Sequence, residues 1–250
     1  MMLPAAFLTR PIAHRALHDR AAGRPENSRA AFRAAIDAGY GIEFDLQLSS
    51  DGQAMVFHDY DLKRLTGVAG AVRQRTAAEL AATRLLDAGD GIPTLAEMLE
   101  MVAGRVPLLI EVKDQDGAMG PDVGPLEQAT AEALRDYTGD VALMSFNPYS
   151  VKALARLCPD RPVGLTSCAG SVEDYPTLSK ARREELARLP VADEIDLAFI
   201  SHDHHDLSNP RVAELKARGV PILCWTIRSP AEEAAAREIA DNVTFEGYAA

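Results

Sequence analysis

The sequence predicts a single-domain α/β protein, a (β/α)8 TIM barrel with a β-hairpin and a small insertion after its second strand. Short apolar runs alternate with helical segments along all 250 residues, without a linker or an internal repeat. Eight of these runs fit parallel strands, and the chain length is that of one such barrel. Residues 1–250 are therefore expected to form one domain, with the insertion at about 49–93.

Nine segments have the length and apolar content of β-strands, and helices with recognisable ends separate most of them. The Ala-rich stretch 28–38 follows Asn27, a candidate N-cap, and stops at Gly39. Thr94 and Glu97 have capping-box spacing at the start of another helix. The strand candidates lie near residues 11–15, 41–48, 53–58, 107–113, 140–146, 162–167, 196–201, 220–226 and 242–246.

Segments 41–48 and 53–58 are too close together to be parallel neighbours, because a parallel crossover needs a dozen or more residues. They are expected to form an antiparallel hairpin around Asp51-Gly52, a favoured pair for a two-residue loop. Such a loop pairs Asp45 with His58. Setting 53–58 aside leaves eight parallel strands, with an open doubly wound sheet as the alternative architecture.

The composition is that of an ordinary globular protein, and it argues against two classes of partner. A formal net charge of -11 argues against nucleic acid or an anionic membrane surface as the main partner. No apolar run is long enough for a membrane span, and the N-terminus lacks the pattern of a secretory signal. The three cysteines have no paired spacing. A cytoplasmic location without stable membrane anchoring is expected, and the oligomeric state is left open.

Three acids are expected at the mouth of the barrel, meaning the carboxyl ends of its parallel strands. Glu43 and Asp45 share one face of their strand, and Glu111 lies on the next parallel strand, about 5–7 Å away. Each pair of charges would repel by roughly 2–3 kcal/mol. An all-oxygen ligand set favours one divalent cation, Mg²⁺ or Ca²⁺, over zinc. The alternative is that buried ion pairs with Arg15 and Lys113 neutralise the acids.

Two histidines, His14 and His58, end apolar strands at the same mouth. Because imidazole titrates near neutral pH, one of them can accept a proton while the other donates one. Arg15 and Lys113 can bind phosphate oxygens, the first through its bidentate fork and the second as a point charge. The combination predicts hydrolysis of a phosphodiester. The alternative for each histidine is a structural role.

Several short motifs occur together in the order and spacing of a known family. They are His14-Arg15, Pro25-Glu26-Asn27-Ser28, Ile42-Glu43-Phe44-Asp45, Asp51-Gly52 followed by His58-Asp59, Ile92-Pro93-Thr94-Leu95, Glu111-Val112-Lys113, Ser145-Phe146 and Trp225-Thr226. On these motifs the chain resembles the glycerophosphodiester phosphodiesterase family over about residues 11–247. The resemblance implies a TIM barrel that uses a divalent metal to hydrolyse glycerophosphodiesters to an alcohol and glycerol 3-phosphate.

The resemblance also implies a role for each matched residue. In that family a glycerol hydroxyl is thought to attack first and to form a cyclic phosphate, whereas this sequence alone equally allows direct attack by water. The implied roles are general acid and base for His14 and His58, metal ligands for Glu43, Asp45 and Glu111, phosphate contacts for Arg15 and Lys113, a site-shaping loop for Glu26 with Asn27, and a pocket wall on the glycerol side for Trp225.

The chain departs from the family at two positions that bear on pocket shape. Ala16 stands where glycine is usual, which is expected to restrict the first loop to conformations that a Cβ tolerates. The last strand ends in Thr244-Phe245-Glu246 instead of Thr-Asp. The histidine-rich stretch 201–205 follows a strand and is expected to be a solvated rim instead of a metal cluster.

Three other functions compete with hydrolysis. One is a lyase of the sphingomyelinase D or phosphoinositide phospholipase type, which stops at a cyclic phosphate. Another is a non-catalytic barrel used as a binding module, although such a protein should have lost a catalytic residue and none is missing. The third is a metal-dependent aldolase-type barrel, which needs no pair of histidines. The sequence does not specify the head-group alcohol.

Overall fold

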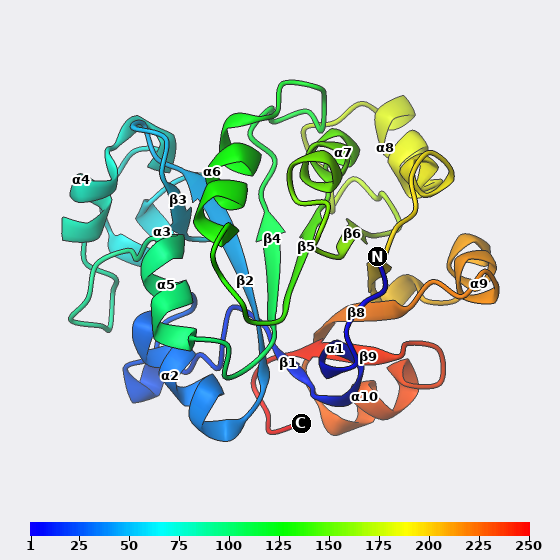
Figure 1. Ribbon diagram of the computed structural model, residues 1–250, viewed down its shortest axis with the longest axis horizontal. Helices are drawn as coiled ribbons and strands as arrows, with labels where there is room; N and C mark the ends of the chain where they lie inside the picture. The colour runs from blue at the N-terminus through cyan, green and yellow to red at the C-terminus, as the bar shows by residue number, and fades with distance from the viewer.

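The computed structural model describes residues 1–250 and contains a closed barrel of parallel strands surrounded by helices (Figure 1). The strands follow one another around the barrel in chain order, and pairing of the first with the second and the last closes it. This arrangement confirms the predicted fold class. The barrel strands are β1 (Ile12–Ala13), β2 (Gly41–Leu48), β4 (Leu108–Val112), β5 (Val141–Ser145), β6 (Val163–Ser167), β7 (Phe199–Asp203), β8 (Ile222–Ile227) and β9 (Asn242–Phe245).

The helices cover the outside of the barrel, and none combines the length and apolar character that crossing a membrane requires. Ser28, not Asn27, caps α2, because its hydroxyl accepts from the N–H of Ala31. Gly39 ends that helix with φ 75°, as predicted. The α-helices are α1 (Ala6–Thr9), α2 (Arg29–Ala38), α3 (Lys63–Thr66), α4 (Ala77–Ala82), α5 (Leu95–Val102), α6 (Pro125–Leu134), α7 (Pro148–Leu157), α8 (Lys180–Ala187), α9 (Pro210–Ala217) and α10 (Pro230–Ala236).

The predicted hairpin is present, but its predicted register is wrong by one residue. Strand β3 (Ala54–Val56) runs antiparallel to β2, with Leu46 opposite Val56. The loop therefore spans three residues, 50–52, and Gly52 adopts the left-handed φ of 81° that such loops require. Asp45 thus lies opposite Phe57 instead of His58, as the 3.0 Å hydrogen bond from the N–H of Phe57 to the Asp45 carbonyl indicates.

The register error has a physical reason, which is that both faces of β3 are buried. Ala54 and Val56 belong to the core between barrel and helices. Met55 and Phe57 pack into a separate apolar cluster of the insertion, together with Leu62, Leu65, Val72, Leu80, Leu85 and Ile92. Alternation of polar and apolar residues fixes a register only where one face is wet. A one-residue slip here exchanges one apolar environment for another.

The barrel interior is apolar in its lower part and polar at its mouth. Leu109, Met144 and Phe199 point inward and pack with Phe7 of α1. On β4 the alternate residues Leu108 and Ile110 face the outer helices. Because side chains alternate along a strand, Glu111 follows Leu109 on the inner face, as predicted. The fold therefore directs this acid into the mouth.

Close packing inside the barrel generates a stability prediction. A Cβ added at Gly164 of β6 would lie 2.6 Å from the ring of Phe199. We expect Gly164→Ala to lower the free energy of unfolding by about 1–3 kcal/mol, measured by urea denaturation. Gly89→Ala is the matched control, because a Cβ there meets no atom within 4 Å. Equal stability of the two variants would contradict this packing.

Candidate active site

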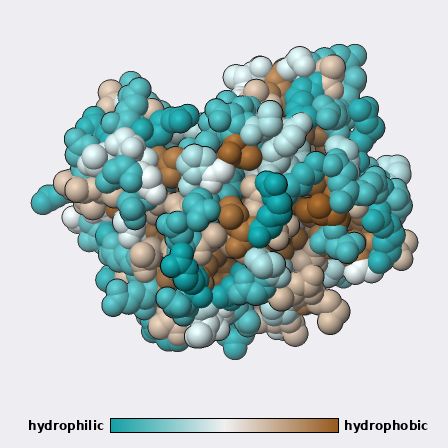
Figure 2. All heavy atoms as spheres, turned by 45° about the horizontal axis from the view of Figure 1, so that its top comes forward, coloured by the Kyte–Doolittle hydropathy of each residue, from teal (hydrophilic) through white to brown (hydrophobic).

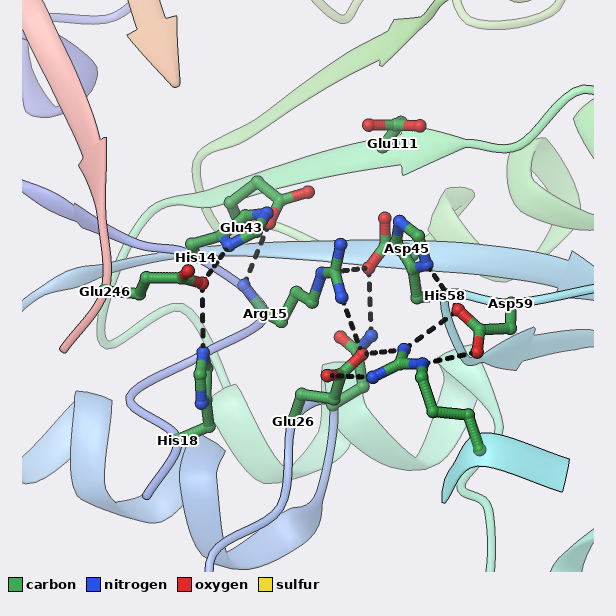
Figure 3. A network of polar contacts seen from close by, with 12 residues as sticks. His14, Arg15, His18, Glu26, Glu43, Asp45, His58, Asp59, Glu111 and Glu246 are labelled. Atoms are coloured by element: carbon green, nitrogen blue, oxygen red, sulfur yellow. Dashed lines mark hydrogen bonds and ion pairs between the residues drawn. The ribbon is translucent and has the colours of Figure 1, made fainter. Parts of the chain in front are cut away.

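A cavity of about 220 Å³ lies at the mouth of the barrel, where the structure brings the predicted site residues together (Figure 3). Of those residues only Glu26 and Asn27 lie outside its lining. Glu26 contacts Arg15 through a 2.8 Å ion pair, and the amide of Asn27 donates to Asp45 Oδ2 at 2.9 Å. The predicted residues in the lining are His14 and Arg15 after β1, Glu43 and Asp45 on β2, His58 after β3, Glu111 and Lys113 at the end of β4, and Trp225 on β8.

Three carboxylates, Glu43, Asp45 and Glu111, form what we call the carboxylate triad. Their oxygen atoms lie within 4.8 Å of one another, and all three residues are at most 6% exposed. Burial, together with the charges of Asp45 and Glu111, raises the pKa of Glu43 well above its usual value. The group therefore carries more negative charge than its surroundings neutralise, and its all-oxygen donor set fits a hard divalent cation.

The predicted alternative, neutralisation by buried ion pairs, applies to part of the triad. Lys113 Nζ lies 2.8 Å from Asp45 Oδ1 and 2.5 Å from Glu111 Oε1. Although burial opposes it, these contacts raise the pKa of Lys113, and the Lys113 charge holds the pKa of Asp45 well below its usual value. Glu43 forms no ion pair and accepts only the backbone N–H of Arg15, at 2.9 Å. The charge of Glu43 is therefore offset only by a proton or by a bound cation.

The loop after β1 presents its backbone to Glu43. Arg15 and Ala16 both adopt left-handed φ values, 51° and 64°. Their N–H groups bind the side chain and the carbonyl of Glu43. Ala16 thus adopts a left-handed conformation that a Cβ tolerates at a strain of about 1–2 kcal/mol, and the hydrogen bond of its N–H to Glu43 helps to compensate for that strain.

His14 is held by a carboxylate that the sequence did not identify as functional. Its Nδ1 lies 2.6 Å from Oε2 of Glu246, which His18 Nε2 also approaches at 3.3 Å. Burial lowers the pKa of His14 to about 4, although Glu246 opposes the shift. The imidazole is thus neutral at neutral pH, and donation of Nδ1–H to Glu246 leaves Nε2 free as an acceptor.

Barrel closure is the signal that would have revealed Glu246. Strand β1 pairs with β9, with Ala13 opposite Phe245, so the residues that follow these two are neighbours at the mouth. Those residues are His14 and Glu246. The departure of the last strand from the Thr-Asp pattern therefore supplies a partner for the first histidine. Arg228 Nε binds the other oxygen of Glu246 at 2.8 Å and holds it in place.

His58 is oriented by a second network (Figure 3). Its Nδ1 lies 2.7 Å from Oδ1 of Asp59. Arg64 Nε lies 2.6 Å from the other oxygen of Asp59, and Arg64 also forms two hydrogen bonds to Glu26. Glu26 in turn binds Arg15 at 2.8 Å. The network links the two sides of the cavity, and it explains why Glu26 shapes the site without lining it.

The stretch 201–205 was expected to be a solvated rim, but part of it is buried. Strand β7 extends to Asp203, so Ser201 and His202 are buried. His202 contacts the Ser167 hydroxyl at 2.8 Å and has a structural role. Only His205 is exposed as expected. The prediction failed because it placed this stretch in a loop after the strand, whereas β7 continues to Asp203.

The far wall of the cavity carries hydroxyl groups that the sequence did not single out. Thr166 on β6, Ser201 on β7 and Thr244 on β9 line it, and all three side-chain oxygens are buried without a hydrogen-bond partner. Unpartnered buried hydroxyls are unfavourable unless a ligand or water satisfies them. This wall therefore has the chemistry to bind a polyhydroxyl group. Trp225 borders it and donates from Nε1 to the Ser201 carbonyl at 3.0 Å.

Comparison with known proteins identifies the family. The model of the glycerophosphoryl diester phosphodiesterase family matches residues 14–243. The chain belongs to this family. A glycerophosphodiester phosphodiesterase of Caldanaerobacter subterraneus is 30% identical over 217 residues, which cover 81% of this chain and 80% of the relative. Family membership confirms the resemblance carried by the motifs and, with it, the class of enzyme.

Solved structures of the family have the same fold. A phosphodiesterase from Oleispira antarctica, in complex with the product sn-glycerol-3-phosphate, has a TM-score of 0.73 at 25% identity. The match covers 96% of this chain and 94% of that one. A glycerophosphodiester phosphodiesterase from Thermotoga maritima has a TM-score of 0.70 at 24% identity and covers 94% and 92% of the two chains. The second match supports the barrel fold alone.

Proposed function

We propose that this member of the family hydrolyses glycerophosphodiesters to an alcohol and glycerol 3-phosphate by acid–base catalysis between His14 and His58. One observation carries the proposal: two histidines, His14 held by Glu246 and His58 held by Asp59, line one cavity together with the carboxylate triad. The known relatives support the substrate class, because one of them was solved with glycerol 3-phosphate as its product.

The carboxylate triad is the proposed site of one divalent cation, Mg²⁺ or Ca²⁺. The lack of an ion pair to Glu43, its raised pKa beside two other carboxylates and the oxygen-only donors support this assignment. When bound, such an ion neutralises charge on the phosphate and polarises its oxygens. Arg15 and Lys113 lie beside the triad and are the proposed cationic contacts of the remaining phosphate oxygens.

His14 is the proposed base and His58 the proposed acid in the first step. Neutral His14 takes the proton of the attacking oxygen on Nε2, while Glu246 stabilises the resulting imidazolium. His58, with Nδ1 held by Asp59, gives its Nε2 proton to the oxygen of the departing alcohol. If a glycerol hydroxyl attacks first, water then opens the cyclic phosphate with the two roles reversed, which restores both histidines.

The glycerol end of the substrate is assigned to the hydroxyl wall of Thr166, Ser201 and Thr244. Three unpartnered side-chain oxygens match the hydroxyls of a glycerol group, and they lie on the side of the cavity away from the insertion. Trp225 borders this wall at the mouth of the barrel. It is therefore the proposed apolar wall against the carbon backbone of glycerol.

Removal of either proposed acid–base residue provides the main test. We expect His14→Ala and His58→Ala each to lower kcat at least about 100-fold on glycerophosphodiesters, because proton transfer contributes roughly that much. Released glycerol 3-phosphate is measured by phosphorus NMR, which also separates it from a cyclic phosphate. His205→Ala is the control, since this exposed histidine lies on the rim. A wild-type rate in either His14→Ala or His58→Ala would refute the assignment.

Cation binding has a readout that is independent of activity. We expect Mg²⁺ or Ca²⁺ at 100 times its Kd to stabilise the protein by about 2.7 kcal/mol and to raise Tm by roughly 5–10 °C. Glu43→Gln and Glu111→Gln should lose this shift. Asp203→Asn is the control, because Asp203, His204 and His205 form a separate group of possible ligands. A shift lost only in Asp203→Asn would place the ion elsewhere.

Glu246 is a proposed positioning residue, and its variant has a specific pH signature. We expect Glu246→Gln to lower kcat about 10-fold or more, with little change in KM, because Nδ1 of His14 loses its carboxylate partner. Glu246 raises the pKa of His14 against the effect of burial. Its removal should therefore move the acid limb of kcat/KM, expected near pH 4 in the wild type, to lower pH. A shift toward higher pH would contradict this role.

A further inference from the structure

A second cavity, of about 660 Å³, adjoins the proposed catalytic cavity on the side of His58. It lies between the insertion that carries α3 and α4 and the segments around α8, where the space-filling outline is notched (Figure 2). Because His58 is the proposed donor to the departing oxygen, this cavity is where the released alcohol would lie. The residues that line both cavities are His58, Glu111, Lys113, Phe146 and Trp225.

Aromatic rings form one wall of the second cavity. Phe146 stacks edge-to-face on Trp225 and on Tyr175, with ring centroids 5.5 Å and 6.2 Å apart. Tyr60 lines the opposite side, from the insertion. The hydrogen bond of Trp225 to the Ser201 carbonyl and the burial of Tyr175 hold this wall in place. Such a set of π-systems offers a cation electrostatic attraction without hydrogen bonds.

The same cavity has an excess of negative charge. Asp61, Asp114 and Asp174 line it, and none of them forms an ion pair with a cationic side chain. Lys113 also lines it, but its ammonium group contacts Asp45 and Glu111 and is the proposed contact of a phosphate oxygen, so its charge is directed toward the catalytic cavity. The other basic group in the lining is His58, paired with Asp59. A positively charged ligand is therefore favoured over an anionic one.

We propose that the preferred substrate releases an alcohol that carries a quaternary ammonium group, an assignment that rests on the proposed function. A primary ammonium would need acceptors for three N–H groups, whereas the faces of the rings supply none and attract a cation only through their π-systems. The three aspartates accept backbone N–H groups, and they also add negative charge to the cavity. A quaternary ammonium has no N–H to satisfy and gains from both the rings and the charge.

The test compares substrates of equal shape and different charge. One is sn-glycerol-3-phosphocholine. The other is its neutral isostere, the corresponding ester of 3,3-dimethylbutan-1-ol, whose head group has the same shape as choline but no charge. We expect kcat/KM for the choline ester to exceed that for the isostere about 10-fold or more at low salt, with the preference falling as ionic strength rises. Equal rates, or a preference for the ethanolamine ester over the choline ester, would overturn the proposal.

A pair of neighbouring acids provides matched variants. Asp174→Asn, which removes a charge from the cavity, should lower the choline-to-isostere ratio about 3-fold or more. Glu173→Gln makes the same change one residue away, outside the lining, and should leave the ratio unchanged. Both side chains are exposed, so neither variant threatens the fold. Identical ratios in the two variants would contradict a role for the charge of Asp174.

Fluorescence separates failure of this proposal from failure of the proposed function. Trp225 is the only tryptophan of the chain and lines the second cavity. Choline should change its emission saturably, and 3,3-dimethylbutan-1-ol should require at least about 10 times the concentration. Binding of choline without hydrolysis of either ester would refute the proposed function alone. Hydrolysis of both esters with no preference between the two alcohols would refute the head-group assignment alone.

Discussion

The crowding of three buried carboxylates in the mouth of a closed barrel is the constraint on which the site depends. Lys113 bridges two of them, and Glu43 is left with a raised pKa and only a backbone N–H as its partner. Without a proton or a cation to offset the charge, this arrangement opposes folding, because burial and the neighbouring negative charges both disfavour ionised Glu43. The surrounding contacts hold the acids close together, as the proposed cation site requires, and Arg15 binds Glu43 from a left-handed turn.

The barrel produces this crowding through its register. Asp45 lies directly opposite Glu111 on the neighbouring parallel strand, and Glu43 lies opposite Leu109, one layer lower. Each acid thus continues an inward-facing row that is apolar further down. Closure of the sheet then sets His14 beside Glu246, although 232 positions separate them in the chain. This contact follows from closure of the sheet, and no local sequence pattern predicts it.

The sequence predicted the position of a residue correctly where the pattern within a single strand determines that position. The alternation in Leu108–Val112 and the strand-end positions of His14 and His58 sufficed to place these residues at one mouth. It failed where the deciding contact lay on another element. The register of β3 depends on an apolar cluster of the insertion, the burial of His202 depends on Ser167, and the partner of His14 comes from β9. Each failure reflects tertiary packing that periodicity does not encode.

The two histidines differ in burial and in their partners, and these differences bear on how the substrate would be oriented in the cavity. The His14 side chain is 14% exposed, and burial lowers its pKa to about 4, so it is neutral at neutral pH, as the proposed base on the side of the hydroxyl wall requires. His58 lies between the two cavities, beside a carboxylate whose pKa its hydrogen bond lowers although burial opposes the shift. A proton accepted on the glycerol side and one released toward the aromatic cavity fit only one orientation of the substrate. The same asymmetry that supports the proposed assignment of acid and base therefore also indicates which half of the diester would leave.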